Sequence, residues 1–293
     1  MYKQDRTKVV MLGTGTPNPV PERSGPCVAI IVDENSYLVD FGTGVVRQAE
    51  RANQMGISAL EAKNLKTAFL THLHSDHTIG LADLIYTPWV LERESPLRIF
   101  GPKGIKKMTD HLLAAYEDDI NARMFGLEQA NKTGIQVIAK EIQEGIIYQD
   151  DLVKVEAFLV DHPPFEAYGF KFVTPDKVVV ISGDTCKNTN LINHAMGCDI
   201  LVHEVISSTG VQLRDPKWKK YHLRVHTTSK DLADIASVVN PGKLVFYHQL
   251  FMVAPDENGR MVTEEEREAE MIAEVKSKYD GIVISANDLD IIF

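Results

Sequence analysis

The stretch Thr71-His72-Leu73-His74-Ser75-Asp76-His77 places four side chains of metal-binding type within six consecutive positions. It follows the apolar run Ala68-Phe69-Leu70, which we predict to be a strand. Residues two apart on an extended chain point to the same side, so His72 and His74 would face one point. A turn at Ser75 would let Asp76 and His77 reach a second point nearby. Imidazole and carboxylate are usual zinc ligands, so this stretch predicts a paired-metal site.

Three further ligand-type residues follow predicted strands, and they do so in a recognisable order. The strands and the residues after them are 153–160 before His162, 178–181 before Asp184, and 243–247 before His248. Together with the histidine stretch, this order resembles the signature of the metallo-β-lactamase superfamily over nearly the whole chain. The resemblance implies an α/β fold, a four-layer αββα sandwich formed by a single domain spanning residues 1–293. Two pseudo-equivalent halves would divide at roughly 1–150 and 151–293.

The same resemblance implies how the ligands are shared between two ions. One ion would be held by His72, His74 and His162, the other by Asp76, His77 and His248, with Asp184 bridging both. A water or hydroxide between the ions would have a lowered pKa and act as the nucleophile. We expect two divalent ions per chain, with zinc first because the donor set is rich in nitrogen. Manganese and iron are also compatible with a mixed nitrogen and oxygen set.

Asp184 also distinguishes between branches of the superfamily. True β-lactamases of this family place Cys or Ser at the corresponding position, so Asp184 speaks against a dedicated antibiotic-destroying enzyme. The ribonuclease Z and arylsulfatase-like branches keep the Asp and the late histidine. They also carry a His-Glu dipeptide, a later His-Thr pair and a characteristic chain end. The matching residues here are His203-Glu204, His226-Thr227 and Ala286-Asn287-Asp288-Leu289. The chain therefore resembles this branch.

From this branch we expect Asp76, His226 and Glu204 to be the catalytic residues. His226 is expected to follow a polar loop at the start of a helix. There it would donate a proton to the leaving oxygen or bind the transition-state anion, while Glu204 accepts its second N–H. The alternative is a histidine that only braces its loop.

The substrate class follows from one departure from ribonuclease Z. That enzyme carries a long arm that grips tRNA between its third histidine and the bridging Asp. Here only 22 positions separate His162 from Asp184, room for one hairpin, and the net charge is −10. Both observations weigh against tRNA as a partner. We expect a small-molecule anionic ester, with a phosphodiester first. The alternatives are a sulfate ester, tRNA 3′ processing as in ribonuclease Z, and a lactone or β-lactam. A non-enzymatic metal scaffold is disfavoured because all seven ligand positions are present.

Several residues outside the ligand set are candidates for substrate contact. His222 precedes the His-Thr pair by one helical turn, and Arg123 could bind an anionic group, although a surface ion pair is its alternative. Trp218 and Tyr221 are candidates for an aromatic wall, with simple packing as the alternative. The helical segment 104–127 is rich in apolar residues. It is either a cover over the metal site or an ordinary packed helix.

Two glycine-containing segments are interpreted as structural. Gly13-Thr14-Gly15 lacks a third glycine and a following helix, so we predict a tight turn and no dinucleotide site. In the segment Asp40-Phe41-Gly42, Asp40 is expected to hydrogen-bond the histidine loop without binding metal. The glycine would permit a close turn.

Composition bounds the remaining possibilities. The 293 residues are 44% hydrophobic and 25% charged, close to globular averages. The three scattered cysteines suggest no disulfide framework. The chain has no run of 18 apolar residues and begins with a polar segment, so we expect a cytoplasmic enzyme that does not enter a membrane. A homodimer is compatible with the sequence.

Overall fold

The computed structural model describes residues 5–255 and 259–293, which divide into two compact units. The first unit contains the described residues up to Gln143 together with Asn287–Phe293, and the second unit is Glu144–Ala286. The expected halves differ from these units at the chain end, which was placed in the second half. The end returns to the first unit because Ile291 and Ile292 pair with Val10 and Val9 of the first strand.

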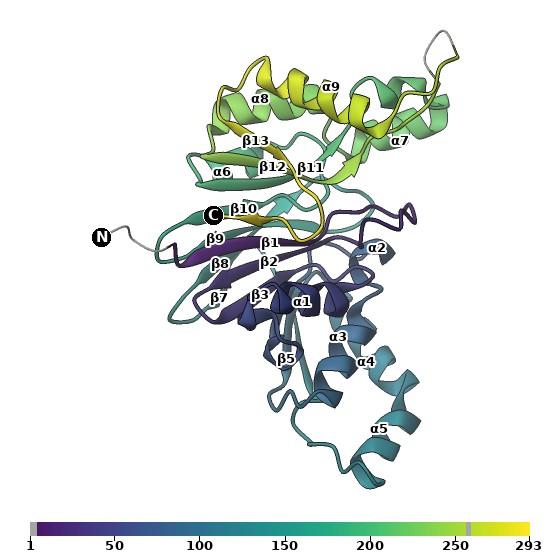
Figure 1. Ribbon diagram of the computed structural model, residues 1–293, viewed down its shortest axis with the longest axis vertical. Helices are drawn as coiled ribbons and strands as arrows, with labels where there is room; N and C mark the ends of the chain where they lie inside the picture. The colour runs from purple at the N-terminus through teal and green to yellow at the C-terminus, as the bar shows by residue number, and fades with distance from the viewer. Residues whose placement is uncertain (1–4, 256–258) are drawn as a thin grey trace. The chain divides into compact units, whose positions relative to one another are not determined.

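The first unit is built on one mixed seven-stranded sheet (Figure 1). Its strands in spatial order are β14 (Ile291–Ile292), β1 (Thr7–Gly13), β2 (Cys27–Val32), β3 (Asn35–Val39), β4 (Thr67–Phe69), β5 (Leu97–Gly101) and β6 (Val137–Glu141). Pairing is antiparallel from β14 to β3 and parallel from β3 to β6. The sheet therefore changes from hairpin connections to crossover connections at β3, and the histidine stretch follows the next strand, β4.

Helices of the first unit lie between its later strands. They are α1 (Val45–Gln54), the short 3-10 turns Ser58–Leu60 and Ala62–Asn64, α2 (Ser75–Thr78), α3 (Leu81–Val90), α4 (Ile105–Ala115) and α5 (Glu117–Phe125). The stripe Val45, Val46, Ala49 and Ala52 on α1 is buried in the core of this unit. These residues recur with the period of an α-helix, so the apolar face of α1 is turned toward the sheet.

The second unit repeats the same plan. Its sheet contains, in spatial order, β13 (Ile282–Ser285), β12 (Lys243–Leu250), β11 (Ile200–Ile206), β10 (Val178–Ile181), β9 (Ala167–Val173), β8 (Lys154–Val160) and β7 (Gly145–Gln149). Pairing is antiparallel from β7 to β10 and parallel from β10 to β13. Two mixed seven-stranded sheets with flanking helices confirm the expected α/β class.

Helices of the second unit pack on both parts of its sheet. They are α6 (Thr189–Ala195), the 3-10 turn Gly210–Leu213, α7 (Pro216–Val225), α8 (Ser229–Val239) and α9 (Glu264–Lys276). Helix α6 packs against β8 and β9, α8 against β11 and α9 against β13. Figure 1 shows α8 and α9 side by side above β13. A capping box begins α9, because Thr263 and Glu266 exchange hydrogen bonds at its first turn.

One expectation about this unit is wrong. The residues before His226 were expected to form a polar loop, but they form α7 with Pro216 in its first turn. Only Val225 of this helix is buried, and most of its residues are basic or polar, which is the composition that was interpreted as a loop. Pro216 in the first turn is a helix-start signal that the sequence did offer.

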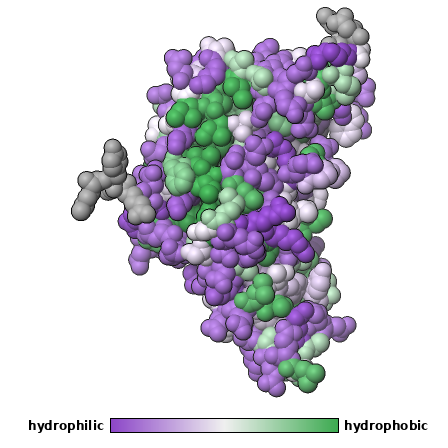
Figure 2. All heavy atoms as spheres, in the orientation of Figure 1, coloured by the Kyte–Doolittle hydropathy of each residue, from purple (hydrophilic) through white to green (hydrophobic). Residues whose placement is uncertain are grey.

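The surface is predominantly hydrophilic on the face shown in Figure 2, with hydrophobic residues gathered over β13. Ile282 of β13 is half-exposed, as an edge strand permits. Among the described residues, no helix is both long enough and apolar enough to cross a membrane.

Candidate metal centre

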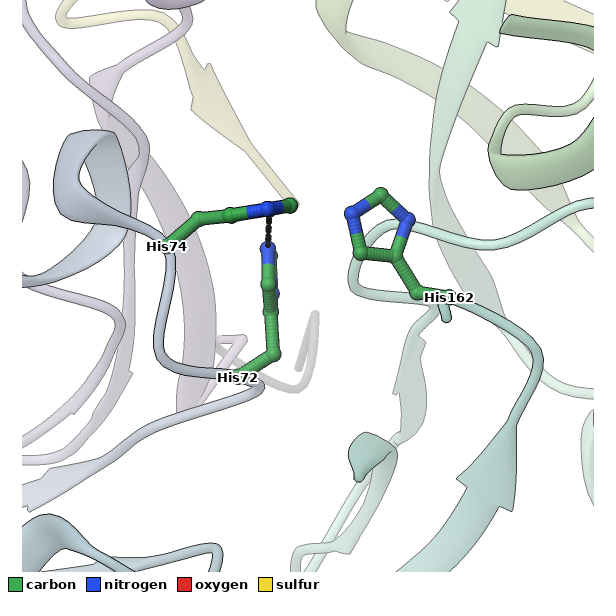
Figure 3. Close-up of side chains that lie close together, drawn as sticks. All are labelled: His72, His74 and His162. Carbon is green, nitrogen blue, oxygen red and sulfur yellow. Dashed lines mark hydrogen bonds between the residues drawn. The ribbon is translucent and has the colours of Figure 1, made fainter. Parts of the chain in front are cut away.

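The histidine stretch forms a compact cluster in the first unit. The Nε2 atom of His72 lies 2.9 Å from the Nδ1 atom of His74, and the two rings meet edge-on at 83° (Figure 3). Two imidazole nitrogens bound to one tetrahedral zinc ion lie roughly 3.3 Å apart, given Zn–N bonds of about 2.0–2.1 Å. The two histidines therefore converge as their spacing in the sequence predicted.

Asp76 and His77 join the same cluster through the single helical turn α2. The Nε2 atom of His77 lies 3.5 Å from the Oδ2 atom of Asp76. The ring centroids of His77 and His72 are 4.2 Å apart, and both of these histidines are buried. All four ligand-type residues of the stretch thus gather in one place within the first unit, and their donor set suits a divalent transition-metal ion.

Asp40 holds this cluster in position, as the sequence predicted. Its buried carboxylate accepts the Nδ1–H of His77 at 2.7 Å and the backbone N–H of Thr71 at 2.8 Å. The hydroxyl of Thr71 also donates to it, and that hydroxyl lies 3.0 Å from the Nδ1 atom of His72. A carboxylate that takes one ring N–H fixes the tautomer, so His77 presents Nε2 on its other side.

Close backbone packing beneath the cluster requires glycine. A Cβ atom on Gly42 would lie 2.6 Å from the carbonyl oxygen of Asp76, and one on Gly80 would lie 2.3 Å from the carbonyl oxygen of Gly42. The N–H of Phe41 donates to the carbonyl of His77 at 3.0 Å. The loop after β3 therefore lies directly against α2, which confirms the expected close turn.

A second cluster, in the second unit, is assembled from several separate segments. His162 follows β8, Asp184 follows β10, Glu204 lies in β11, His226 follows α7 and His248 lies in β12. All five are buried. The ligand atoms of His162, Asp184 and His226 lie within 4.8 Å of one another, as do those of Glu204, His226 and His248. His226 is therefore common to both groups.

A hydrogen bond and a β-bulge orient two histidines of the second cluster, His162 and His248. The Nδ1–H of His162 donates to the carbonyl of Val225 at 2.9 Å, which leaves Nε2 as its donor atom for a metal. His248 was expected just after a strand, but β12 continues to Leu250. The pairing of β12 with β11 skips His248, whose φ is 47°. This β-bulge re-aims the side chain, and the Nε2 atom of His248 lies 3.6 Å from the Oδ2 atom of Asp184.

Glu204, in strand β11, connects two loops of the second unit. Its Oε1 atom accepts the backbone N–H of Thr227 at 2.7 Å and that of Thr185 at 3.4 Å. Its Oε2 atom lies 3.4 Å from the Nδ1 atom of His226, which is the proximity expected from the sequence. Burial raises the pKa of Glu204 well above its usual value, and the nearby charge of Asp184 raises it further. The neighbouring His203 is fully buried, and this burial lowers its pKa to about 4.

The two expected substrate residues differ in their surroundings. His222 lies on α7 with its ring 5.7 Å from that of His226, and its pKa falls to about 4 because of burial and the charges of His226 and Arg214. Arg123 lies on α5 and pairs with Asp119 at 3.0 Å and Glu128 at 2.8 Å. The surface ion pair is therefore what the structure shows at Arg123, and no contact supports its assignment to a substrate.

The helical segment 104–127 forms α4 and α5. It packs on the core of the first unit through Met108, Leu112 and Ile120. A Cβ atom on Gly104, just before α4, would lie 2.9 Å from the Cδ1 atom of Leu73. The start of α4 therefore contacts the histidine loop, whereas α5 has no buried residue.

Comparison with known proteins places the chain in a family. The family model described as "Anti-Pycsar protein Apyc1" matches residues 7–249. The chain belongs to this family. Relatives of the Apyc1-family chain include ribonuclease Z of Mycobacterium sp. (strain KMS), 33% identical over 251 residues that cover 85% of this chain and 86% of the relative. Ribonuclease Z of Mycobacterium bovis (strain BCG / Pasteur 1173P2) is 30% identical over 287 residues, 96% of each chain.

Solved structures of similar fold cover nearly the whole Apyc1-family chain. The metallo-β-lactamase fold protein YhfI from Bacillus subtilis superposes with a TM-score of 0.73 at 17% identity, covering 98% of this chain and 99% of its own. Human tRNase Z, short form, gives 0.69 at 22% identity with 98% of both chains covered. The metallo-β-lactamase fold expected from the sequence is thus confirmed. Together with the buried histidine and aspartate clusters, these findings make the chain a metal-dependent hydrolase of this fold.

Proposed function

We propose that this chain hydrolyses the phosphodiester bond of a cyclic mononucleotide, using two divalent metal ions. The Apyc1 family, to which the chain belongs, is one of cyclic nucleotide phosphodiesterases. The observation that carries the choice of a small substrate is the short connection between His162 and Asp184. It contains only the hairpin of β9 and β10, closed by a turn in which Thr174 bonds Lys177. This connection has no arm that could hold a large RNA.

The residues of both clusters suit divalent zinc. In this proposal His72, His74 and His162 would hold one ion, Asp76, His77 and His248 would hold the other, and Asp184 would contribute to both. The assignment follows from the order of the ligands in the sequence and from the family resemblance. The donor chemistry of each unit supports the assignment, because imidazole nitrogens and carboxylate oxygens form both clusters. A hydrogen bond also orients one ligand histidine in each unit: Asp40 orients His77, and the carbonyl of Val225 orients His162. When bound, the ions would supply an activated water and polarise the phosphodiester.

The residues around the ions complete the chemistry. Hydrolysis adds a hydroxyl to phosphorus and breaks the bond from phosphorus to a sugar oxygen, which must then gain a proton. We assign that proton to His226, which Glu204 approaches at its Nδ1 atom. The backbone N–H groups of Thr227 and Thr185 hold Glu204 from the other side. A sugar alkoxide is a poor leaving group, so a positioned acid matters more for a cyclic nucleotide than for an aryl ester.

A direct assay tests this proposal. The zinc-loaded chain is given purine and pyrimidine 3′,5′-cyclic mononucleotides, an aryl sulfate and a precursor tRNA, each at physiological salt, with the metal-free chain as control. We expect metal-dependent release of nucleoside monophosphate and little action on the sulfate or the tRNA. Failure to open any cyclic nucleotide, with activity on another of these substrates, would contradict the proposal.

Ribonuclease Z activity is the second candidate. It is favoured by the 33% identity to the mycobacterial ribonuclease Z over 85% of this chain. Efficient removal of the trailer from precursor tRNA at one defined site would establish it in place of the first. The arylsulfatase-like alternative receives no support from the relatives described above.

A further inference from the structure

Helix α7 concentrates positive charge in an acidic chain. The net charge of the whole sequence is −10, yet Asp215 is the only acidic residue between positions 214 and 224. The basic residues of this segment are Arg214, Lys217, Lys219, Lys220 and Arg224. Nearly all of them are exposed. The segment therefore forms a local positive surface that would attract an anionic ligand.

Aromatic rings are interleaved with these basic residues. Trp218 is 45% exposed and Tyr221 is 39% exposed, whereas the other tryptophan, Trp89, is only 1% exposed. The Trp218 ring lies 6.1 Å from that of His222 at an angle of 30°, and the Tyr221 ring lies 5.2 Å from it at 65°. The ammonium of Lys217 lies 5.5 Å from the centre of the Trp218 ring. We call Trp218, Tyr221 and His222 the aromatic shelf.

The shelf leads to the second cluster along one face of the helix. Trp218, His222 and His226 are spaced four residues apart, which aligns them on a helical surface. The ring of His226 lies 5.7 Å from that of His222, 5.9 Å from that of His248 and 5.5 Å from that of His162. All of these residues belong to the second unit, so a continuous row of rings connects an exposed surface to the expected metal ligands.

Ordinary helix packing does not account for this arrangement. An exposed tryptophan on a helix is common by itself, but here it coincides with the charge concentration and with a row of rings that ends at a ligand cluster. A nucleotide has the matching form, since its flat aromatic base is joined through one sugar to its anionic phosphodiester. Bases of every kind stack on aromatic side chains, and cationic side chains strengthen this contact.

We infer that the aromatic shelf stacks the nucleobase of the substrate while the basic residues of α7 attract its phosphate. This inference rests on the proposed function and adds a base-binding site to it. Stacking depends little on the identity of the base, so the site would accept purines and pyrimidines alike. Trp218 is then a binding residue that contributes to KM and takes no part in the bond-breaking step.

The kinetic test compares four zinc-loaded proteins, namely the wild type, Trp218→Ala, Trp218→Phe and Leu223→Ala. Leu223 is an exposed apolar residue on the same helix and serves as the matched control. We expect Trp218→Ala to raise KM for cyclic nucleotides about 10-fold or more with kcat nearly unchanged. Trp218→Phe keeps a flat ring and should restore most of the affinity. The methyl riboside 3′,5′-cyclic phosphate, which has no base, should be unaffected by any of these changes.

Two kinetic outcomes would overturn the inference. One is a Trp218→Ala protein that behaves like Leu223→Ala with cyclic nucleotides. The other is an equal loss on the base-free substrate, which would mean that the substitution acts through the fold of α7.

A binding test separates this inference from the proposed reaction. Stacking of a base on Trp218 should quench tryptophan fluorescence when a nucleoside 5′-monophosphate is added to the zinc-loaded chain. Trp218→Phe, in which only the buried Trp89 remains, should show no quenching. Quenching without hydrolysis of any cyclic nucleotide would uphold the shelf and refute the reaction. Hydrolysis without quenching would refute the shelf. Quenching by single-stranded RNA at far lower concentrations than by mononucleotides would overturn the assignment to a mononucleotide.

Discussion

The two ligand clusters differ in how the chain builds them. The first cluster comes from one short segment of the chain after β4, and Asp40 holds it from the loop after β3. The second cluster comes from the ends of β8 and β10, from β11 and β12, and from the residue after α7. The ligands of the first cluster are near neighbours in the chain and need support from one further loop, whereas the second cluster exists only when several strands have the correct register. A substitution in the first cluster should therefore affect mainly metal binding. A substitution in the second cluster should also lower the stability of the sheet.

The largest expected effect is loss of a ligand from either cluster. We expect His72→Ala and Asp184→Asn each to abolish detectable hydrolysis, because every ligand contributes to metal affinity before it contributes to rate. Elemental analysis and activity assays of the purified variants measure this. Because the second cluster depends on the register of several strands, Asp184→Asn should also lower the melting temperature more than His72→Ala does. Full activity in either variant would remove that residue from the metal centre.

His226→Ala should have the next largest effect. We expect the variant to retain its metal and to lose on the order of 10²-fold in rate with cyclic nucleotides, the usual scale for a positioned acid. The loss should be smaller with bis(p-nitrophenyl) phosphate, because p-nitrophenolate leaves without a proton. An equal loss of rate with both substrates would count against the role of His226 as the acid. Loss of metal would instead show that His226 is a metal ligand beside His162 and Asp184.

Asp40 offers a smaller effect that is specific to the first cluster. Asp40→Asn should weaken metal binding by about 10- to 100-fold, the usual consequence of removing the carboxylate that orients a ligand histidine. Asp33→Asn is the matched control. Both aspartates have positive φ, but Asp33 is exposed and pairs with Arg6 at the surface. Zinc titration in competition with a chelator measures the difference. Equal affinities in the two variants would show that Asp40 does not orient His77.

The contrast between the clusters also explains what could be predicted from the sequence. The first cluster was predictable in detail, since spacing and a following turn determine where His72, His74 and Asp76 point. The second was predictable as a list of strand ends, but the bulge at His248 was not, because it depends on the pairing of β12 with β11. The helix before His226 was missed for a different reason, since its residues are mostly exposed and its basic residues were interpreted as a polar loop.

Tertiary context decided the remaining differences. The burial that raises the pKa of Glu204 arises from the surrounding strands, and no local pattern in the sequence encodes it. The return of Ile291 and Ile292 to β1 is likewise a long-range pairing. Arg123 shows the opposite case, since its partners Asp119 and Glu128 lie four and five residues away and were readable as a surface ion pair.

The smallest expected effect is on the free energy of unfolding and concerns Asp234, a carboxylate outside both clusters. Asp234 on α8 binds Lys187 and Lys278, and their hydrogen bonds lower its pKa from 3.8 to about 2. Because the folded pKa lies below the unfolded one, this stabilisation is present above pH 4 and is lost as the pH falls toward 2. Asp234→Asn should lower the free energy of unfolding by less than about 1 kcal/mol near pH 7, since the ion pairs are partly exposed.

Urea unfolding across this pH range, with Asp280→Asn as control, would show whether the difference in the free energy of unfolding disappears in acid. A difference that persists at pH 2 would contradict the assignment.

Metal content tests most directly whether the seven ligand residues bind two ions. The chain is stripped of metal, reloaded with zinc, freed of excess and analysed by elemental analysis, alongside Asp76→Asn and His248→Ala. We expect two equivalents of zinc per wild-type chain, because seven ligand side chains exceed what one tetrahedral ion can use. We also expect weaker retention of one equivalent in each variant. One tightly held zinc ion in the wild type, with both variants unchanged in metal content and activity, would contradict the two-ion assignment.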